Sequence, residues 1–354
     1  MASRHRGGGE RRVGAAGKVS WGRVVSRAGA GRAGAFAWTM RYPGVDDYAM
    51  RVRVVSRSAA SPLSSGTHGL AAGLADQLAE ACEGRLGEIT WFKADWQRGG
   101  AATGTARFRL DDAEEVPVVV KLPVVQRERM WTSRLQRDDE QAVVPKLYAA
   151  GETLGGYDLA WIVIEHFPHG PLGLHWHDQH IERIADAVAR FYAAASAYPV
   201  DEPPKIEAWD DLLRDAQQSV RINDIANSKR WKSAMKTLRG RLTDLVSEWR
   251  ARPVGDWLHG DLHLANAMSR ESLEAGTAYL IDMAEVRAGH WVEDAVYLER
   301  QLWARPQRLR AVKPVKAIAD ARRRRGLTVE EGYPRLAMIR RALLAATAPR
   351  FLKT

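Results

Sequence analysis

The chain has 354 residues, of which 45% are hydrophobic and 27% are charged, so it can form a sizeable core and has an ordinary globular composition. No apolar run approaches the roughly 20 residues that a membrane-spanning helix needs, and a single cysteine, Cys82, excludes an intramolecular disulfide framework. We therefore expect a reducing, cytoplasmic setting without membrane contact.

The formal net charge of +10 is concentrated at the start of the chain. Residues 1–60 carry 12 basic and 3 acidic side chains, whereas the remainder carries 41 basic and 40 acidic ones. The Gly-, Ala-, Arg- and Ser-rich segment 1–67 predicts a disordered leader or an extension upstream of the true start. A targeting segment and a nucleic-acid-binding tail are the alternatives. The nearly neutral remainder predicts no nucleic-acid binding by the folded part.

The next segment, 68–168, has the pattern of a small antiparallel sheet with few helices. Apolar residues recur at helical spacing over 69–82, and a further helix is predicted over 126–137. A Gly-rich turn over 97–104 separates the first two predicted strands. Short β-branched runs predict strands at 89–94, 106–110, 116–122, 146–150 and 157–167.

Helices dominate the segment 169–354. Apolar stripes at helical spacing predict helices at 181–195, 209–220, 230–249, 294–303 and 338–346. The basic cluster 322–325 is interpreted as the solvated end of a helix. A sheet followed by helices predicts an α+β fold, with a hinge near Pro168.

One loop in the helical half has the composition of a reaction centre. The run 257–266, WLHGDLHLAN, places the carboxylate of Asp261 five residues before the amide of Asn266, and the apolar run 278–281 then leads to Asp282. Two acids and an amide on adjoining loops suit a site that holds Mg²⁺ and orients a hydroxyl for attack on ATP. A zinc or iron site on His259 and His263 is disfavoured, because their spacing matches no common metal motif and leaves the amide unexplained.

The run 259–266 resembles the H-G-D-x-x-x-x-N loop of the aminoglycoside phosphotransferase and choline kinase family. It also resembles the H-R-D-L-x-x-x-N loop of protein kinases, except that Gly260 replaces the arginine. Ile281-Asp282 and the later Glu293-Asp294 are similar to further elements of that family, and the resemblance extends over roughly 70–350. It implies a two-lobed protein-kinase-like fold, with a small antiparallel-sheet N-lobe (68–168) and a mostly helical C-lobe (169–354).

The resemblance also implies an activity, which is ATP- and Mg²⁺-dependent phosphorylation of a small-molecule hydroxyl. Asp261 would accept or orient the hydroxyl proton, and Asn266 and Asp282 would bind Mg²⁺ through hard oxygen atoms. His259 would support the loop by hydrogen bonding, and Asp294 would tie the loop to the helix behind it.

In the N-lobe, the resemblance assigns Lys121, at the end of the third strand, to the α- and β-phosphates of the nucleotide. Its expected acidic partner lies on the following helix. Glu128 is the preferred partner, because an apolar helical pattern follows it, and Glu140 is the alternative.

Two further parts of the N-lobe would contact the nucleotide. Gly99 and Gly100 lie in the turn between the first two strands, where backbone N–H groups can approach phosphates. Glu165 and Phe167 would form the hinge whose backbone meets adenine. The glycines do not follow the G-x-G-x-x-G spacing, so the turn alone is a weak signal.

Two departures from protein kinases argue against a protein substrate. Met283-Ala284 stands where protein kinases have Phe-Gly, and no A-P-E segment follows. Aminoglycosides, choline-like amines, sugars, amino acids and macrolides all stay open as acceptors, with 200–250 as the expected specificity region. The competing interpretation is a non-catalytic nucleotide-binding scaffold with a degenerate kinase fold.

Overall fold

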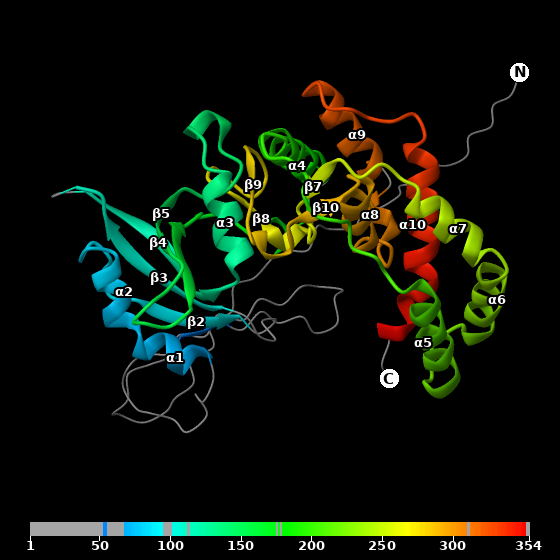
Figure 1. The fold of residues 1–354 in the computed structure, drawn as a ribbon, viewed down its shortest axis with the longest axis horizontal. Helices are drawn as coiled ribbons and strands as arrows, with labels where there is room; N and C mark the ends of the chain where they lie inside the picture. The colour runs from blue at the N-terminus through cyan, green and yellow to red at the C-terminus, as the bar shows by residue number, and fades with distance from the viewer. Residues whose placement is uncertain are drawn as a thin grey trace, which may run out of the picture. The chain divides into compact units, whose positions relative to one another are not determined.

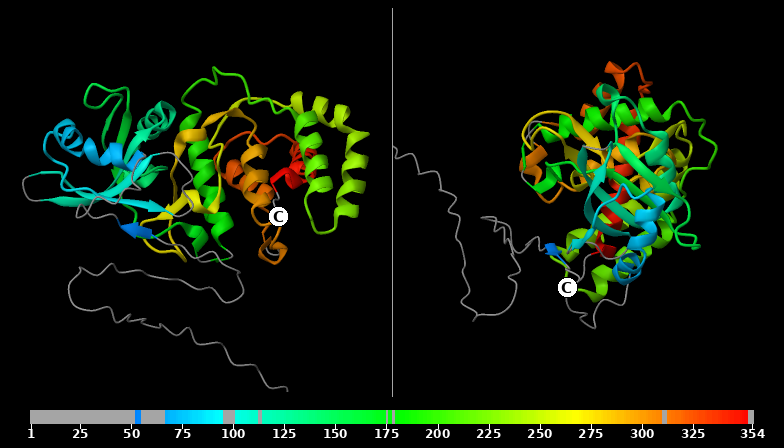
Figure 2. Two further views of the ribbon diagram at one scale, coloured as in Figure 1. Left: turned by 90° about the horizontal axis from the view of Figure 1, so that it is seen from below. Right: turned by 90° about the vertical axis from the view of Figure 1, so that its left-hand side faces the viewer.

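The computed structural model of the chain describes residues 52–54, 67–94, 101–111, 114–174, 176–177, 179–309 and 312–351. All of them belong to the unit Trp38–Thr354. The described residues before the hinge are mainly strands and those after it are mainly helices, which form two separate groups (Figures 1 and 2). The predicted α+β, two-lobed fold is therefore confirmed, with a small antiparallel-sheet N-lobe and a larger helical C-lobe.

The N-lobe contains a six-stranded sheet in which all neighbouring strands are antiparallel. Its strands are β1 (Val52–Val54), β2 (Thr90–Ala94), β3 (Ala102–Arg109), β4 (Glu115–Val124), β5 (Leu147–Gly151) and β6 (Ala160–Glu165), in the order β1-β2-β3-β4-β6-β5. The predicted meander of the first three strands corresponds to β2, β3 and β4. Strand β1 lies within the segment predicted to be a leader, so the sheet begins earlier in the chain than the sequence predicts.

Side chains along β4 point alternately to the two faces of the N-lobe sheet. Val118, Val120 and Leu122 are fully buried in a core shared with α1 (Thr67–Gly73) and α2 (Ala75–Ala81). Lys121 lies between them in sequence, so its side chain leaves the sheet on the opposite face. Helix α3 (Gln126–Arg134) begins just after β4 and brings its first turn to that face.

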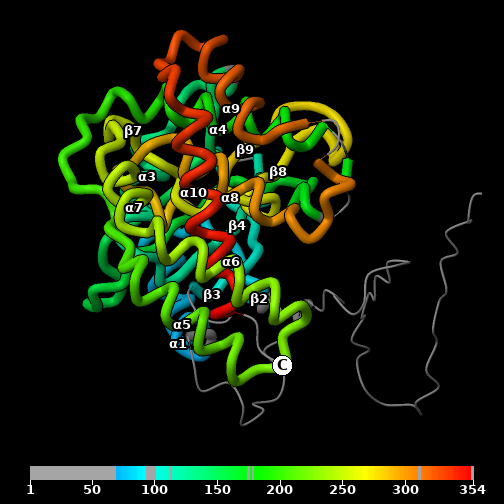
Figure 3. Tube along the Cα trace, turned by 90° about the vertical axis from the view of Figure 1, so that its right-hand side faces the viewer, coloured from blue at the N-terminus to red at the C-terminus, as the bar shows by residue number. Residues whose placement is uncertain are grey.

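The C-lobe is formed by helices around one large apolar core. These helices are α4 (His180–Ala195), α5 (Trp209–Ile222), α6 (Ser228–Arg239), α7 (Leu242–Arg250), α8 (Val292–Arg300), α9 (Pro314–Arg324) and α10 (Tyr333–Thr347). Helices α5, α6 and α7 lie beside α10 (Figure 3). The single helix predicted over 230–249 is in fact two helices, because the chain turns at Gly240.

Two short strand pairs hold the loop 259–266. Strand β7 (Asp256–Leu258) pairs with β10 (Arg287–Gly289), and β8 (Ala267–Ser269) pairs with β9 (Ala278–Leu280). The loop therefore starts at the end of one pair and ends at the start of the other. Helix α4 contacts both β7 and β9, so it supports the loop from the core side.

Two local predictions are wrong, and packing explains both. Gly104 is not part of the predicted turn; it lies within β3 opposite Trp91, where a Cβ would be 2.5 Å from the side chain of Ile89. The cluster 322–325 is not simply solvated, because Arg322 is 2% exposed and donates a hydrogen bond to Asp256.

None of the helices in the described part of the chain combines the length and apolar character that a bilayer crossing requires.

Candidate active site

The backbone of the loop after β7 is held by one buried acid. Asp294 of α8 accepts hydrogen bonds from the backbone N–H groups of His259, at 2.9 Å, and Gly260, at 3.0 Å. The hydroxyl of Tyr192 donates a third hydrogen bond to Asp294 at 3.0 Å. Burial holds the pKa of Asp294 above its usual value. The sequence predicted this tie between the loop and the helix, and the structure places the residues accordingly.

Gly260 occupies a position that no other residue fits. Its φ is +82°, and a Cβ at this position would lie 2.0 Å from the carbonyl oxygen of Glu285 and 2.7 Å from Nη1 of Arg287. A left-handed backbone angle already disfavours other residues, and the close carbonyl adds a steric clash. The glycine that distinguishes this loop from that of protein kinases therefore lets the chain segment after Asp282 pack against it.

The carboxylate of Asp261 receives three hydrogen-bond donors. Oδ1 accepts from the hydroxyl of Tyr297 at 2.8 Å, and Oδ2 accepts from Nδ2 of Asn266 at 3.2 Å. Nε2 of His263 lies 3.3 Å from Oδ2. Burial by itself would raise the pKa of Asp261, but the contacts with His263 and Tyr297 outweigh it and lower the pKa from 3.8 to about 2. Asp261 is therefore ionised at neutral pH.

Sequence reasoning missed Tyr297 altogether and assigned no role to His263. A usable signal existed for the tyrosine, because Tyr297 follows Asp294 by three residues on one helix. Residues at that spacing share a helix face, so a helix that presents Asp294 to the loop also presents Tyr297.

His259 lies beneath the loop and is fully buried. Its Nδ1 accepts a hydrogen bond from the backbone N–H of Asp261 at 3.3 Å, so its Nε2 carries the proton and donates to the carbonyl of Ile281 at 3.0 Å. Burial lowers the pKa of His259. A neutral His259 therefore joins the loop to the strand that leads to Asp282.

Asn266 and Asp282 lie at the ends of adjoining segments. The backbone N–H of Ile281 donates to the carbonyl of Asn266 at 3.0 Å, which brings the two segments together. Nδ2 of Asn266 also donates to the carbonyl of Asp261 at 3.1 Å, so its Oδ1 is turned away from that loop. Asp282 has a left-handed backbone, with φ +67°, a costly conformation for a residue other than glycine.

The nucleotide-side lysine has an acidic partner on the expected helix. Nζ of Lys121 forms an ion pair with Oε1 of Glu128, and both side chains are largely buried. Burial alone would lower the pKa of Lys121, but attraction to Glu128 and Asp282 holds it above its usual value. The structure thus pairs Lys121 with Glu128, the preferred partner. It also places Lys121 close enough to Asp282 for their charges to interact.

The two hinge residues have different surroundings. The carboxylate of Glu165 accepts two hydrogen bonds from Arg270, at 2.7 and 2.8 Å, so its side chain is already paired within the protein. The ring of Phe167 stacks on Tyr279 with centroids 4.9 Å apart. Among the described residues, none accepts a hydrogen bond from the backbone N–H of Phe167. Gly99 and Gly100 lie outside the described residues.

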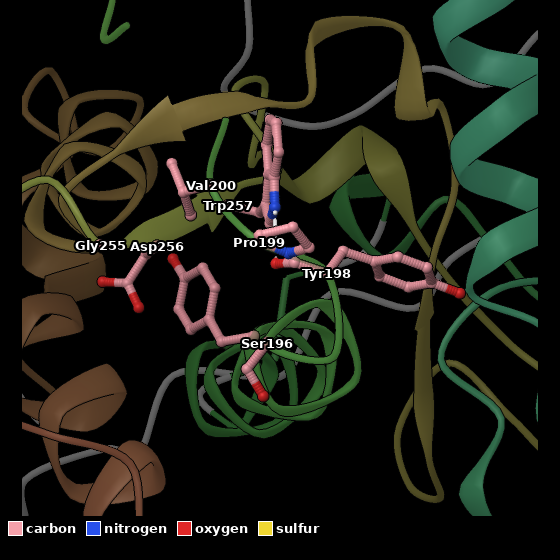
Figure 4. A pocket seen from close by; sticks show the side chains of 8 residues that line it. Ser196, Tyr198, Pro199, Val200, Gly255, Asp256 and Trp257 are labelled. Atoms are coloured by element: carbon pink, nitrogen blue, oxygen red, sulfur yellow. Dashed lines mark hydrogen bonds between the residues drawn. The ribbon is translucent and has the colours of Figure 1, made fainter. Parts of the chain in front are cut away.

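A cavity of about 260 Å³ lies behind the loop, where β7 begins (Figure 4). It is lined by Tyr192, Ser196, Tyr198, Pro199, Val200, Gly255, Asp256 and Trp257. Its polar side chains have partners inside the protein; Asp256, for example, accepts from Arg322, and the hydroxyl of Tyr198 donates to a backbone carbonyl. Each of these polar side chains is therefore already hydrogen-bonded within the described part of the protein.

A second cavity, of about 320 Å³, lies beside the segment that touches Gly260. It is lined by Arg127, Glu202, Pro203, Lys205, Ala284, Glu285, Val286 and Arg287. The residues that line this cavity come both from the start of the expected specificity region and from the segment that follows Asp282.

Comparison with solved structures gives similar chains of low sequence identity. An aminoglycoside-3'-phosphotransferase of type VIII is 22% identical, covering 77% of this chain and 98% of that chain, with a TM-score of 0.40. A choline/ethanolamine kinase family protein from Mesorhizobium loti is 13% identical, with coverages of 80% and 84% and a TM-score of 0.46. The aminoglycoside phosphotransferase APH(3'')-Id from Streptomyces rimosus, in complex with ADP and streptomycin, is 16% identical, with coverages of 77% and 98% and a TM-score of 0.40.

Comparison with family models gives a more decisive result, although no curated protein matches the chain in sequence. The model of the phosphotransferase enzyme family matches residues 94–339, which is more than half of the chain and includes every residue of the site described above. The chain therefore belongs to the phosphotransferase enzyme family and is an enzyme that transfers a phosphoryl group to an alcohol group of a small molecule.

Proposed function

We propose that the chain transfers the γ-phosphoryl group of ATP, with Mg²⁺, to a hydroxyl of a small molecule. One observation carries this proposal. Asp261 and Asn266 are joined by a hydrogen bond on one loop, and the adjoining Asp282 lies close enough to the Lys121–Glu128 pair to influence the pKa of Lys121. A hydroxyl-orienting acid, two oxygen donors for a cation and a phosphate-binding lysine therefore belong to one site.

The nucleotide side is proposed from the N-lobe residues. Lys121, held by Glu128, contacts the α- and β-phosphates, and the backbone N–H of Phe167, which has no acceptor among the described residues, donates to adenine. The side chain of Glu165 is committed to Arg270, so only the backbone of Glu165 is available to a nucleotide. Gly99 and Gly100 complete the proposal, with backbone N–H groups directed at the phosphates.

Asn266 and Asp282 suit Mg²⁺. The amide nitrogen of Asn266 is occupied by Asp261, which leaves its oxygen available, and Asp282 provides a carboxylate on the adjoining segment. No group of three or more His, Cys, Asp or Glu side chains placed to hold a metal ion by themselves occurs among the residues the structure describes. A pair of oxygen ligands fits Mg²⁺, which usually takes its remaining ligands from water and phosphate. When bound, Mg²⁺ neutralises charge on the β- and γ-phosphates.

Catalysis then depends on positioning and charge. Asp261 accepts the hydrogen bond of the acceptor hydroxyl and directs its oxygen at the γ-phosphorus. Weak basicity is sufficient, because the transition state is loose and the proton can leave late. Neutral His259 and buried Asp294 keep the loop backbone fixed, so no reorganisation is needed during transfer.

The acceptor is proposed to belong to the aminoglycoside, choline-like, sugar or amino-acid type. The cavity beside Gly260 adjoins the segment after Asp282 and is the proposed place for it. A cytoplasmic location is proposed on the single buried cysteine, Cys82, because that compartment supplies ATP and is reducing.

The test has two stages. Thermal unfolding of the full chain is first measured with ATP, with Mg²⁺, and with both; stabilisation by ATP that requires Mg²⁺ is expected. ADP release is then measured with a panel of hydroxyl compounds that includes choline, streptomycin, simple sugars and homoserine. At least one compound is expected to raise ADP release above the rate with water alone.

The variant Asp261→Asn separates binding from transfer. It keeps the shape of the side chain, so stabilisation by ATP and Mg²⁺ should persist, while turnover falls by roughly 10²- to 10⁴-fold. Equal turnover of Asp261→Asn and the wild type would refute the assignment. Binding of ATP without transfer to any compound of the panel would favour the non-catalytic scaffold.

A further inference from the structure

We propose that Tyr297 is a positioning residue for phosphoryl transfer: its hydroxyl fixes the carboxylate of Asp261 so that one acceptor position, on Oδ1, faces the substrate hydroxyl. The inference rests on the proposed function, because it assigns Asp261 to the acceptor hydroxyl. It goes further by naming the oxygen atom that the substrate meets and the residue that selects it.

The carboxylate of Asp261 has hydrogen-bond donors on both of its oxygens, and their number leaves one acceptor position. An ionised carboxylate has about four lone-pair positions, two on each oxygen. Oδ2 receives Nδ2 of Asn266 at 3.2 Å and Nε2 of His263 at 3.3 Å, which fill both of its positions. Oδ1 receives the hydroxyl of Tyr297 at 2.8 Å and keeps one position. The substrate hydroxyl therefore has one place to donate, next to the tyrosine.

The contact of His263 with Oδ2 is a donor contact even when the histidine is neutral. Nδ1 of His263 accepts a hydrogen bond from the backbone N–H of Ala265 at 3.1 Å, at the start of the short helical turn Leu264–Asn266. A nitrogen that accepts from an N–H group carries no proton, so the proton of the neutral ring is on Nε2. Oδ2 is thus occupied without any change in the charge of His263.

Tyr297 is held in place by helix α8. Its neighbours on α8, Val296 and Leu298, are fully buried, so the helix is fixed in the core. The same helix supplies Asp294, which binds two backbone N–H groups of the loop. Helix α8 therefore sets the loop backbone through Asp294 and the carboxylate orientation through Tyr297.

Tyr297 is also suited to act only as a donor. Burial and the hydrogen bond to Asp261 raise its pKa to about 12, so the hydroxyl keeps its proton throughout the physiological range. Its side chain is half-buried. Without its hydroxyl, the carboxylate of Asp261 is held only at Oδ2, by Asn266 and His263, and both positions on Oδ1 open to water.

This geometry predicts a specific defect in Tyr297→Phe. Transfer to a fixed substrate hydroxyl needs one orientation of the carboxylate, whereas water can approach in several orientations. The variant should phosphorylate the acceptor about tenfold more slowly while hydrolysing ATP at nearly the wild-type rate. The ratio of phosphorylated acceptor to inorganic phosphate, which only hydrolysis releases, should therefore fall about tenfold, with the KM for ATP unchanged.

The experiment measures that ratio in the full chain, with ATP, Mg²⁺ and the panel compound that gives the wild type its highest ADP release. The ratio does not depend on the fraction of active protein, so partial misfolding of Tyr297→Phe cannot imitate the effect. Tyr198→Phe is the matched control, since its hydroxyl donates to the carbonyl of Arg134 at 2.9 Å, outside the site. It should keep the wild-type ratio.

Three outcomes are distinguishable. A lower ratio in Tyr297→Phe alone supports the inference. An unchanged ratio, with both rates lowered together or not at all, overturns it and leaves Tyr297 a structural role. A wild type that phosphorylates none of the compounds contradicts the proposed function itself, and the inference then fails with it.

Discussion

Arg127 of helix α3 donates hydrogen bonds to both carboxylate oxygens of Glu202, at 3.0 and 2.9 Å, and so joins the N-lobe helix to the C-lobe. The same guanidinium donates to the carbonyl of Val286 at 2.7 Å, just after Asp282. Because Glu128 is the next residue on α3, this contact also restrains the partner of Lys121. The position of the Lys121–Glu128 pair is thus coupled to the segment that borders the second cavity.

Replacing Arg127 by Ala should weaken nucleotide binding without abolishing it. The pair with Glu202 is partly exposed and contributes little energy by itself, but three hydrogen bonds between the lobes are lost together. We expect the KM for ATP to rise about three- to tenfold, measured by ADP release. Arg129→Ala is the control, because Arg129 on the same helix pairs with the exposed Glu152. An equal effect of both variants would refute the coupling.

Gly260→Ala should be strongly destabilising and inactive. The left-handed backbone costs about 1–2 kcal/mol for any other residue, and the carbonyl of Glu285 adds a clash. Gly156→Ala separates the two effects, because Gly156 has φ +81° but nothing within 4 Å of a Cβ. Urea unfolding should show a loss of about 1–2 kcal/mol for Gly156→Ala and a clearly larger loss for Gly260→Ala. Similar losses would mean that the close contact at Gly260 is unimportant.

Glu128→Ala should leave a buried lysine without its partner. Removing one member of a buried ion pair costs about 3–5 kcal/mol, and the freed Lys121 loses its fixed position. Urea unfolding should show that loss, and stabilisation by ATP with Mg²⁺ should largely disappear. Glu140→Ala should change neither measurement. The opposite result would show that Glu140 is the functional partner.

Asp261 should contribute to stability in a pH-dependent way. Its pKa is about 2 in the folded chain against an ordinary 3.8, so the unfolded chain binds the proton more readily. The stabilisation is complete above the ordinary pKa and is lost as the pH falls through about 2. Urea unfolding is measured without nucleotide or metal. The free energy of unfolding of the wild type minus that of Asp261→Asn should decrease from pH 5 toward pH 2. A difference that stays constant over this range would contradict the low pKa.

Much of the fold follows from local patterns in the sequence. The alternation in 116–122 and the stripe in 181–195 predict β4 and α4 with small errors at their ends. Element ends and breaks were less predictable, since the interruption at Gly240 and the place of Gly104 inside β3 depend on packing between elements.

The sequence by itself determined the chemistry available to this protein. The loop residues Asp261 and Asn266, the following Asp282 and Lys121 in the strand before α3 are recognisable because their order and spacing along the chain are local properties. The tertiary structure decided which groups meet across long sequence separations. Tyr297, 36 residues after Asp261, reaches its carboxylate because α8 packs behind the loop. Such contacts depend on how helices pack in the core, and that packing cannot be predicted from local patterns in the sequence.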